Sequence, residues 1–164
     1  MGHSAVAPTS EVIGRLSKHV DQINAGEIEG VCPGQPTSFT AACTAGDAIA
    51  QGDLNLVITS GKIPEEYVKV EFTGQPTDAQ HLQLVPGNTQ GAKHCLDSLD
   101  GVTMWRPAKW DMESLVGPIL KLTKDRTVLH PTHGAVTMLA GTTVHCRYQR
   151  EWEKEEAKER RARD

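Results

Sequence analysis

Three histidines in the C-terminal half of the sequence have the residue type and spacing that a metal site needs. His130 and His133 are three residues apart on a turn that contains Pro131, and His145 falls on the next expected strand. A hairpin could bring these imidazoles to one point, and His94 could supply a fourth ligand. Neutral imidazoles suit zinc or another divalent metal. The sequence therefore offers His94, His130, His133 and His145 as metal ligands; in the alternative, the turn histidines bond the local backbone and need no metal.

Other catalytic arrangements find less support in the residue pattern. His145 and Cys146 are adjacent, and neighbours on a strand point to opposite faces, so they cannot form a base and nucleophile. The segment 86–94 resembles a phosphate-binding loop only in part. Its glycines are too close together, Ala92 intervenes before the lysine, and His94 replaces the hydroxyl residue. The sequence thus favours a non-enzymatic protein and leaves an enzyme open through the histidines.

Four further residues could contact a partner. Trp105, Arg106 and Trp110 lie close together in one charged segment, and Trp152 stands near the C-terminal end. Tryptophan and arginine are enriched where proteins bind one another. We expect Trp105, Arg106, Trp110 and Trp152 to be partner-binding residues.

The elements that would position these groups fall into three zones. In segment 1–30, apolar residues recur at helical spacing between Ser10 and Ala25, which predicts an amphipathic helix. Segment 31–149 reads as a β domain. Segment 150–164 is a charged tail, in which Glu156 and Arg160 are four residues apart, and this spacing favours an exposed helix.

Short alternating segments separated by glycine and proline support the β assignment. The clearest expected strands are Leu54–Thr59 and Tyr67–Phe72; the others are His81–Val85, Val102–Trp105, Ile119–Leu122, Thr127–His130, Ala135–Leu139 and Thr142–Gln149. In the last of these, Val144, Cys146 and Tyr148 share the expected core face. The predicted fold is mainly β, a small barrel or sandwich, with an N-terminal amphipathic helix and a charged C-terminal helix.

Composition narrows the classes of partner. The 164 residues carry a formal net charge of -4, which argues against a nucleic-acid binder. The sequence has no apolar stretch of about 18 residues, so we expect no membrane-spanning helix. A cytoplasmic location is expected, or the virion if a phage encodes the protein.

Three motifs together resemble a group of uncharacterised small proteins from bacteria and phages. They are Gly52–Leu54 at a strand start, Gly91–His94, and the His-Pro-x-His-Gly turn at 130–134. In that group a glycine-rich hairpin and a closing Tyr-Gln-Arg-Glu strand follow, as at Leu139–Thr142 and Tyr148–Glu151 here. The group has a second histidine near the position of His94, and its absence here puts a carried-over metal site in doubt. The resemblance implies a bacterial or phage origin and no particular activity.

These observations predict a structural or interaction protein, a subunit of a larger assembly such as a phage particle or accessory complex. Its contacts would be protein partners or further copies, made through the terminal helices. The alternative is a His-rich metal-binding β-barrel, in which the bound metal could support an enzyme.

Overall fold

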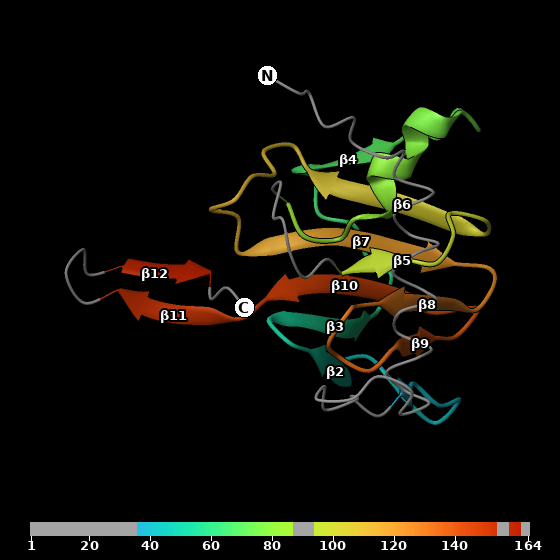
Figure 1. Ribbon diagram of the computed structural model, residues 1–164, viewed down its shortest axis with the longest axis horizontal. Helices are drawn as coiled ribbons and strands as arrows, with labels where there is room; N and C mark the ends of the chain where they lie inside the picture. The colour runs from blue at the N-terminus through green and yellow to red at the C-terminus, as the bar shows by residue number, and fades with distance from the viewer. Residues whose placement is uncertain (1–35, 87–93, 154–157, 162–164) are drawn as a thin grey trace, which may run out of the picture.

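The computed structural model describes residues 36–86, 94–153 and 158–161, which form a β body of two sheets with a separate hairpin (Figure 1). The larger sheet contains β2 (Ala48–Gln51), β3 (Leu54–Thr59), β4 (Tyr67–Val70), β6 (Val102–Pro107), β7 (Val116–Leu122) and β10 (Thr143–Tyr148). The smaller sheet contains β1 (Thr37–Ser38), β5 (Cys95–Leu96), β8 (Arg126–Leu129) and β9 (Val136–Met138).

The two sheets differ in their strand pairing. The larger sheet has the order β2-β3-β10-β7-β6-β4, and all of its pairs are antiparallel. The smaller sheet has the order β1-β9-β8-β5, in which β1 runs parallel to β9. The mainly β part of the predicted fold is therefore observed, and β2 and β4 form the edges of the larger sheet.

One hydrophobic core is shared by the two sheets, because alternate residues of each strand point into it. On β10, Val144, Cys146 and Tyr148 are buried in this core, as the alternation predicted. The other members come mostly from β3, β5, β6, β7, β8 and β9: Leu54, Leu56, Ile58, Cys95, Leu96, Val102, Met104, Leu120, Leu122, Val128, Leu129, Val136 and Met138.

Gly117 in β7 lies directly beside the side chain of Tyr148. A Cβ atom at this position would overlap the hydroxyl of Tyr148, whose ring fills the space beside the glycine. Tyr148 is buried and donates from its hydroxyl to the carbonyl of Leu84 at 2.7 Å. The missing side chain of Gly117 therefore gives Tyr148 its place in the core.

The strand predicted at His81–Val85 is replaced by a 3-10 helix, η1 (Pro76–Leu82), and by extended chain after it. Pro76 begins η1, where a backbone N–H is not needed. Thr73 and Gly74 lie just before η1, and their backbone N–H groups both donate to the carboxylate of Asp78, within η1, at 2.7 Å. This local turn chemistry outweighs the weak alternation, and the strand prediction was wrong.

The charged C-terminal helix was also wrongly predicted. Residues 150–161 contain β11 (Arg150–Glu153) and β12 (Lys158–Arg161), which pair antiparallel as a two-stranded sheet. In this register Glu151 lies opposite Arg160 and Glu153 lies opposite Lys158. The other two facing pairs are Trp152 with Glu159 and the like-charged Arg150 with Arg161, so the charge pattern that suggested a helix is also compatible with a hairpin.

The predicted fold class, with a helix at each end, is thus corrected. Among the described residues the only helix is η1, with seven residues. The helix predicted between Ser10 and Ala25 lies outside the described residues.

Candidate functional site

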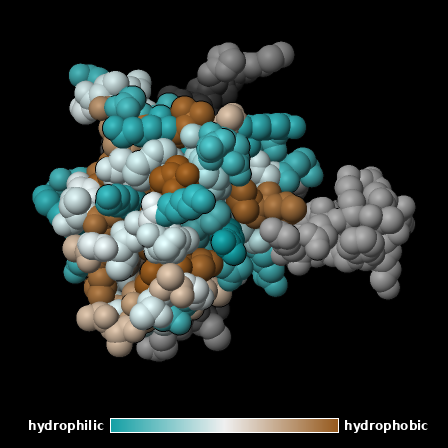
Figure 2. All heavy atoms as spheres, turned by 180° about the vertical axis from the view of Figure 1, so that it is seen from behind, coloured by the Kyte–Doolittle hydropathy of each residue, from teal (hydrophilic) through white to brown (hydrophobic). Residues whose placement is uncertain are grey.

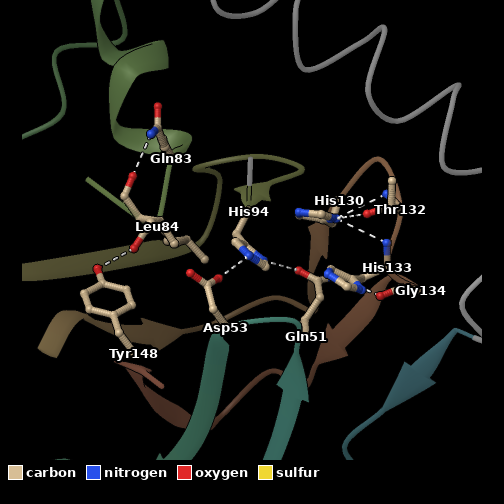
Figure 3. A network of polar contacts seen from close by, with 11 residues as sticks. Gln51, Asp53, Gln83, Leu84, His94, His130, Thr132, His133, Gly134 and Tyr148 are labelled. Atoms are coloured by element: carbon tan, nitrogen blue, oxygen red, sulfur yellow. Dashed lines mark hydrogen bonds and ion pairs between the residues drawn. The ribbon is translucent and has the colours of Figure 1, made fainter. Parts of the chain in front are cut away.

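A cluster of five polar residues lies where the ends of β2, β5 and β8 meet, and we call it the histidine cluster (Figure 3). Gln51 ends β2, Asp53 precedes β3, His94 precedes β5, His130 follows β8, and His133 stands on the turn beyond. All are buried except His133, which is half-buried. The cluster joins chain segments from both sheets.

The amide of Gln51 is held in one orientation. Its nitrogen Nε2 donates to the backbone carbonyls of Val128 at 3.1 Å and Gly134 at 2.8 Å. Only the amide nitrogen can donate, so the oxygen Oε1 faces Nδ1 of His94, 2.9 Å away. Because an amide oxygen can only accept, Nδ1 of His94 carries a proton.

The second nitrogen of His94 faces a carboxylate. Its Nε2 lies 2.9 Å from Oδ1 of Asp53, and these side chains are only 3% and 7% exposed. With Nδ1 protonated, the pair has one more proton between Nε2 and Oδ1. Whether that proton sits on His94 or on Asp53, the pair is neutral as a whole, which lowers the cost of burying it.

His130 organises the turn that follows β8. Its Nδ1 accepts from the backbone N–H groups of Thr132 and His133, both at 3.2 Å, as Figure 3 shows. Burial, together with the charges of His94 and His133, lowers the pKa of His130 to about 3. The ring is therefore neutral near pH 7, and its proton is on Nε2. That atom is buried and has no hydrogen-bond partner in the described part of the chain.

The imidazole rings of His94, His130 and His133 lie close together, in tilted or stacked arrangements. The ring centroid of His130 lies 4.4 Å from that of His94 and 4.4 Å from that of His133. The centroids of His94 and His133 are 6.3 Å apart. His94, His130 and His133, three of the four predicted ligands, are thus brought together.

This arrangement does not form a metal site as it stands. Zinc binds imidazole nitrogens at about 2.0–2.1 Å from a shared centre. Both nitrogens of His94 already have partners, and Nδ1 of His130 must accept from its turn. Within the residues that the structure describes, no three His, Cys, Asp or Glu could hold a metal ion. A divalent ion here would first have to break these hydrogen bonds, so metal binding stays a prediction.

His145, the fourth predicted ligand, belongs to a separate network. It is on β10 between the core residues Val144 and Cys146, so its side chain points to the opposite face of the larger sheet. There Nε2 of His145 lies 2.9 Å from the Tyr67 hydroxyl, and the Tyr67 hydroxyl lies 3.1 Å from the carbonyl of Gly117.

The hydrogen bonds of this second network run in one direction. Nε of Arg147 donates to Nδ1 of His145 at 3.3 Å, so His145 carries its proton on Nε2 and donates it to Tyr67. Tyr67 then donates to Gly117. Burial, with a smaller contribution from Arg147, lowers the pKa of His145 to about 4. Burial, aided by Glu66, raises the pKa of Tyr67 to about 12, so both groups are neutral near pH 7.

The predicted partner-binding residues are divided among three places. Trp105 and Arg106 are neighbours on β6 and point to opposite faces of the sheet. Trp110 lies against Arg106, with the guanidinium carbon 4.3 Å from the ring centroid. Trp152 lies in β11 of the C-terminal hairpin. The structure therefore joins Arg106 with Trp110 and separates Trp105 and Trp152 from them.

Gln51 and Asp53 are the functional residues that sequence reasoning missed. Both flank the turn glycine Gly52, where a polar residue is ordinary. His94 contacts them from more than forty positions further along the chain. No spacing in the sequence signals a contact of that range.

Comparison with known proteins gives a family and no activity. Residues 50–148, more than half of the chain, match the model of a family described as a domain of unknown function, DUF8820. No curated protein and no solved structure matches. In the described part of the chain, no helix is long and apolar enough to cross a membrane.

Proposed function

Because the chain belongs to the DUF8820 family, whose function is unknown, we propose a function from its geometry: a non-enzymatic subunit of a larger protein assembly. The contact element in this proposal is the C-terminal hairpin of β11 and β12, and its partner is a neighbouring copy of the chain. The observation that carries the proposal is the position of the hairpin, which pairs with neither sheet of the body.

The hairpin projects away from the body (Figure 1). A two-stranded hairpin is marginally stable by itself in water and gains stability when it packs on another surface. Its outer strand edges also have backbone groups available for pairing with another chain. A projecting hairpin of this kind is suited to reach a neighbouring subunit.

Charge supports a second copy as the partner. From Arg150 to Asp164 the sequence has six basic and six acidic residues, so the segment has no net charge. Two such segments can pair their charges without the repulsion that two segments of one sign would meet. Trp152 adds a residue type that is enriched at the centre of protein interfaces.

One face of the body fits this assignment. On the face seen from behind, apolar residues form separate patches among hydrophilic ones (Figure 2). A broad apolar docking face would look different, because such interfaces need a contiguous patch. The hairpin is therefore a stronger candidate for the contact than this face.

The histidine cluster has a supporting role in this proposal. Gln51 at the end of β2 bonds the carbonyl of Val128 in β8, so the cluster connects the two sheets through buried polar contacts. His130 fixes the turn that follows. A rigid body of this kind suits a subunit that presents an arm to its neighbour.

The proposal includes the kind of assembly: a phage particle or an accessory complex, in line with the sequence resemblance. The unpartnered Nε2 atom of His130 favours one second candidate, a divalent metal held by the histidine cluster. The two candidates differ in oligomeric state and in metal content.

Native mass spectrometry distinguishes the candidates. The full chain, prepared with metal present, is compared with a chain that ends at Gln149 and with Trp152→Ala. Lys109→Ala is the matched control, because that side chain is 89% exposed and lies on the body. We expect oligomers for the full chain and the control, and dissociation for the other two. A monomeric full chain with one bound divalent ion would overturn the proposal.

A further inference from the structure

Arg106 lies on the inner face of the larger sheet, at its β4 edge. Met104, two residues earlier on β6, is fully buried in the core, so Arg106 points to the same side. Val68 of β4 is directly opposite Arg106 in the ladder and shares this face. The side chain of Val68 is 58% exposed, so solvent reaches this end of the inner face.

One edge of the Arg106 guanidinium has no partner among the residues that the structure describes. Its Nε and Nη2 atoms are buried and make no hydrogen bond with any of them. These two N–H groups lie on the same edge of the planar guanidinium and point in parallel. That edge matches the two oxygens of a carboxylate, which binds such a fork with two hydrogen bonds.

Nε of Arg126 is also buried without a hydrogen-bond partner among the described residues, but Arg106 differs from Arg126 and Arg147 in the groups beside it. Arg126 lies 3.7 Å from the carboxylate of Asp97, and Arg147 donates to His145. Arg106 has no carboxylate within ion-pair distance among the described residues. Burial lowers the pKa of its guanidinium, against smaller opposing contributions from Tyr148 and Cys146.

The ring of Trp110 packs against the guanidinium of Arg106. The ring lies 4.3 Å from the guanidinium carbon, and its indole N–H donates to the hydroxyl of Tyr148 at 2.9 Å. Tyr148 is itself fixed by its bond to the carbonyl of Leu84. A guanidinium packed over a fixed ring has less freedom to move, which prepares its edge for a ligand.

A second polar group near Arg106 is also unsatisfied. Nδ1 of His81, in η1, is buried and bonds none of the residues described by the structure. Burial and then the charge of Arg106 lower the pKa of His81, while Asp78 opposes this change. The charge of Arg106 thus acts on its neighbours without an anion to neutralise it.

We propose that Arg106 is a carboxylate-binding site, in which Nε and Nη2 donate to the two oxygens and Trp110 supports the guanidinium. The exposed side chain of Val68 provides an apolar contact beside the charged group. The carboxylate belongs either to an acidic side chain of a second copy of the chain or to a small free acid. This site lies on the body and does not depend on the C-terminal hairpin.

The test is an NMR titration of the labelled full chain with sodium acetate, against sodium chloride at matched ionic strength. The Nε–H resonance of Arg106 and the indole N–H resonance of Trp110 are followed. We expect saturable shifts of both with acetate and none with chloride. Shifts that do not saturate, or that chloride reproduces, would overturn the proposal.

Three variants make the test specific. Arg106→Gln should abolish the acetate-dependent shift of Trp110, and Arg106→Lys should weaken binding on the order of tenfold, because lysine keeps the charge and loses the fork. Arg126→Gln should bind acetate as the unaltered chain does. Equal binding by all three variants would contradict the proposal. A native-like dispersion of the remaining resonances shows that each variant is folded.

The source of the carboxylate follows from a second measurement. If the carboxylate comes from a second copy of the chain, acetate should compete with self-association, and Arg106→Gln should weaken self-association. If it is a small acid, acetate should bind and leave association unchanged. A monomer that binds acetate at Arg106 would overturn the assembly proposal and leave this site standing. An oligomer that does not bind acetate would overturn the Arg106 proposal and leave the assembly proposal standing.

Discussion

Oε1 of Gln51 and Nδ1 of His94 are 2.9 Å apart, and the direction of this hydrogen bond is fixed by atoms outside the pair. The amide nitrogen of Gln51 already donates to two backbone carbonyls, so its oxygen must accept from His94. His94 is left with only its other nitrogen to share a proton with Asp53. A single amide thus fixes which nitrogen of His94 faces Asp53 with a shared proton.

Replacing Gln51 by Leu tests this relationship. The variant keeps a similar volume but removes three hydrogen bonds, which takes the acceptor from Nδ1–H of His94 and the Gln51 donor from two backbone carbonyls. Since a buried unsatisfied polar group costs about 1–3 kcal/mol, we expect a loss of about 3 kcal/mol in the free energy of unfolding. Urea denaturation measures it. A loss below about 0.5 kcal/mol, the level of a surface change, would show that the bonds do not form.

Stability should fall in mild acid because of His145. Its pKa is lowered from 6.5 to about 4 in the folded protein, so below pH 6.5 the unfolded chain binds the proton more tightly. The contribution of the neutral ring is complete above pH 6.5 and is lost as the pH falls toward 4. It amounts to about 3 kcal/mol. His130, with a pKa of about 3, adds a loss of the same sign that continues further into acid.

The measurement is the free energy of unfolding between pH 7 and pH 4, for the unaltered chain and for His145→Gln. Glutamine does not titrate, so the variant should show a shallower pH dependence. Parallel curves for the two proteins would mean that His145 is not the group that titrates.

Tyr67→Phe should break the network on the outer face of the sheet. The variant leaves Nε2–H of His145 and the carbonyl of Gly117 without their bonds to the hydroxyl. We expect a loss of about 1–2 kcal/mol in the free energy of unfolding, because the site is only partly buried and water can replace part of the bonding. If the double variant Tyr67→Phe/His145→Gln shows simply the sum of the two single losses, the residues are not coupled.

Gly117→Ala should be costly although it adds one methyl group. The new Cβ would overlap the hydroxyl of Tyr148, which would have to leave its bonds to Leu84 and Trp110. Overpacking of this kind costs about 1–3 kcal/mol. Thermal unfolding measures the loss, and Gly117→Ala combined with Tyr148→Phe should recover part of it. A neutral single variant would show that the ring has room to move.

The sequence anticipated the β body well, because period-two alternation reports burial directly. The strand Leu54–Thr59 and the core face of β10 followed from it. The same alternation on β10 already placed His145 on the face away from Cys146. The expected convergence of His145 with His130 would have required the side chain to cross the sheet.

Other features depend on information that a linear pattern does not hold. Glu156 and Arg160 suit a helix at four-residue spacing, yet Arg160 also suits a strand that faces Glu151. Charge pairs alone cannot decide between these structures. The role of Gln51 depends on backbone carbonyls contributed by a distant strand and turn, and that contact exists only in the folded chain.

The most direct test of the assembly proposal is native mass spectrometry of the full chain beside the chain that ends at Gln149, both prepared with divalent metal present. We predict a metal-free oligomer for the full chain and a folded monomer for the shorter one. A full chain that is monomeric and carries one divalent ion would contradict the account and make the histidine cluster the functional centre.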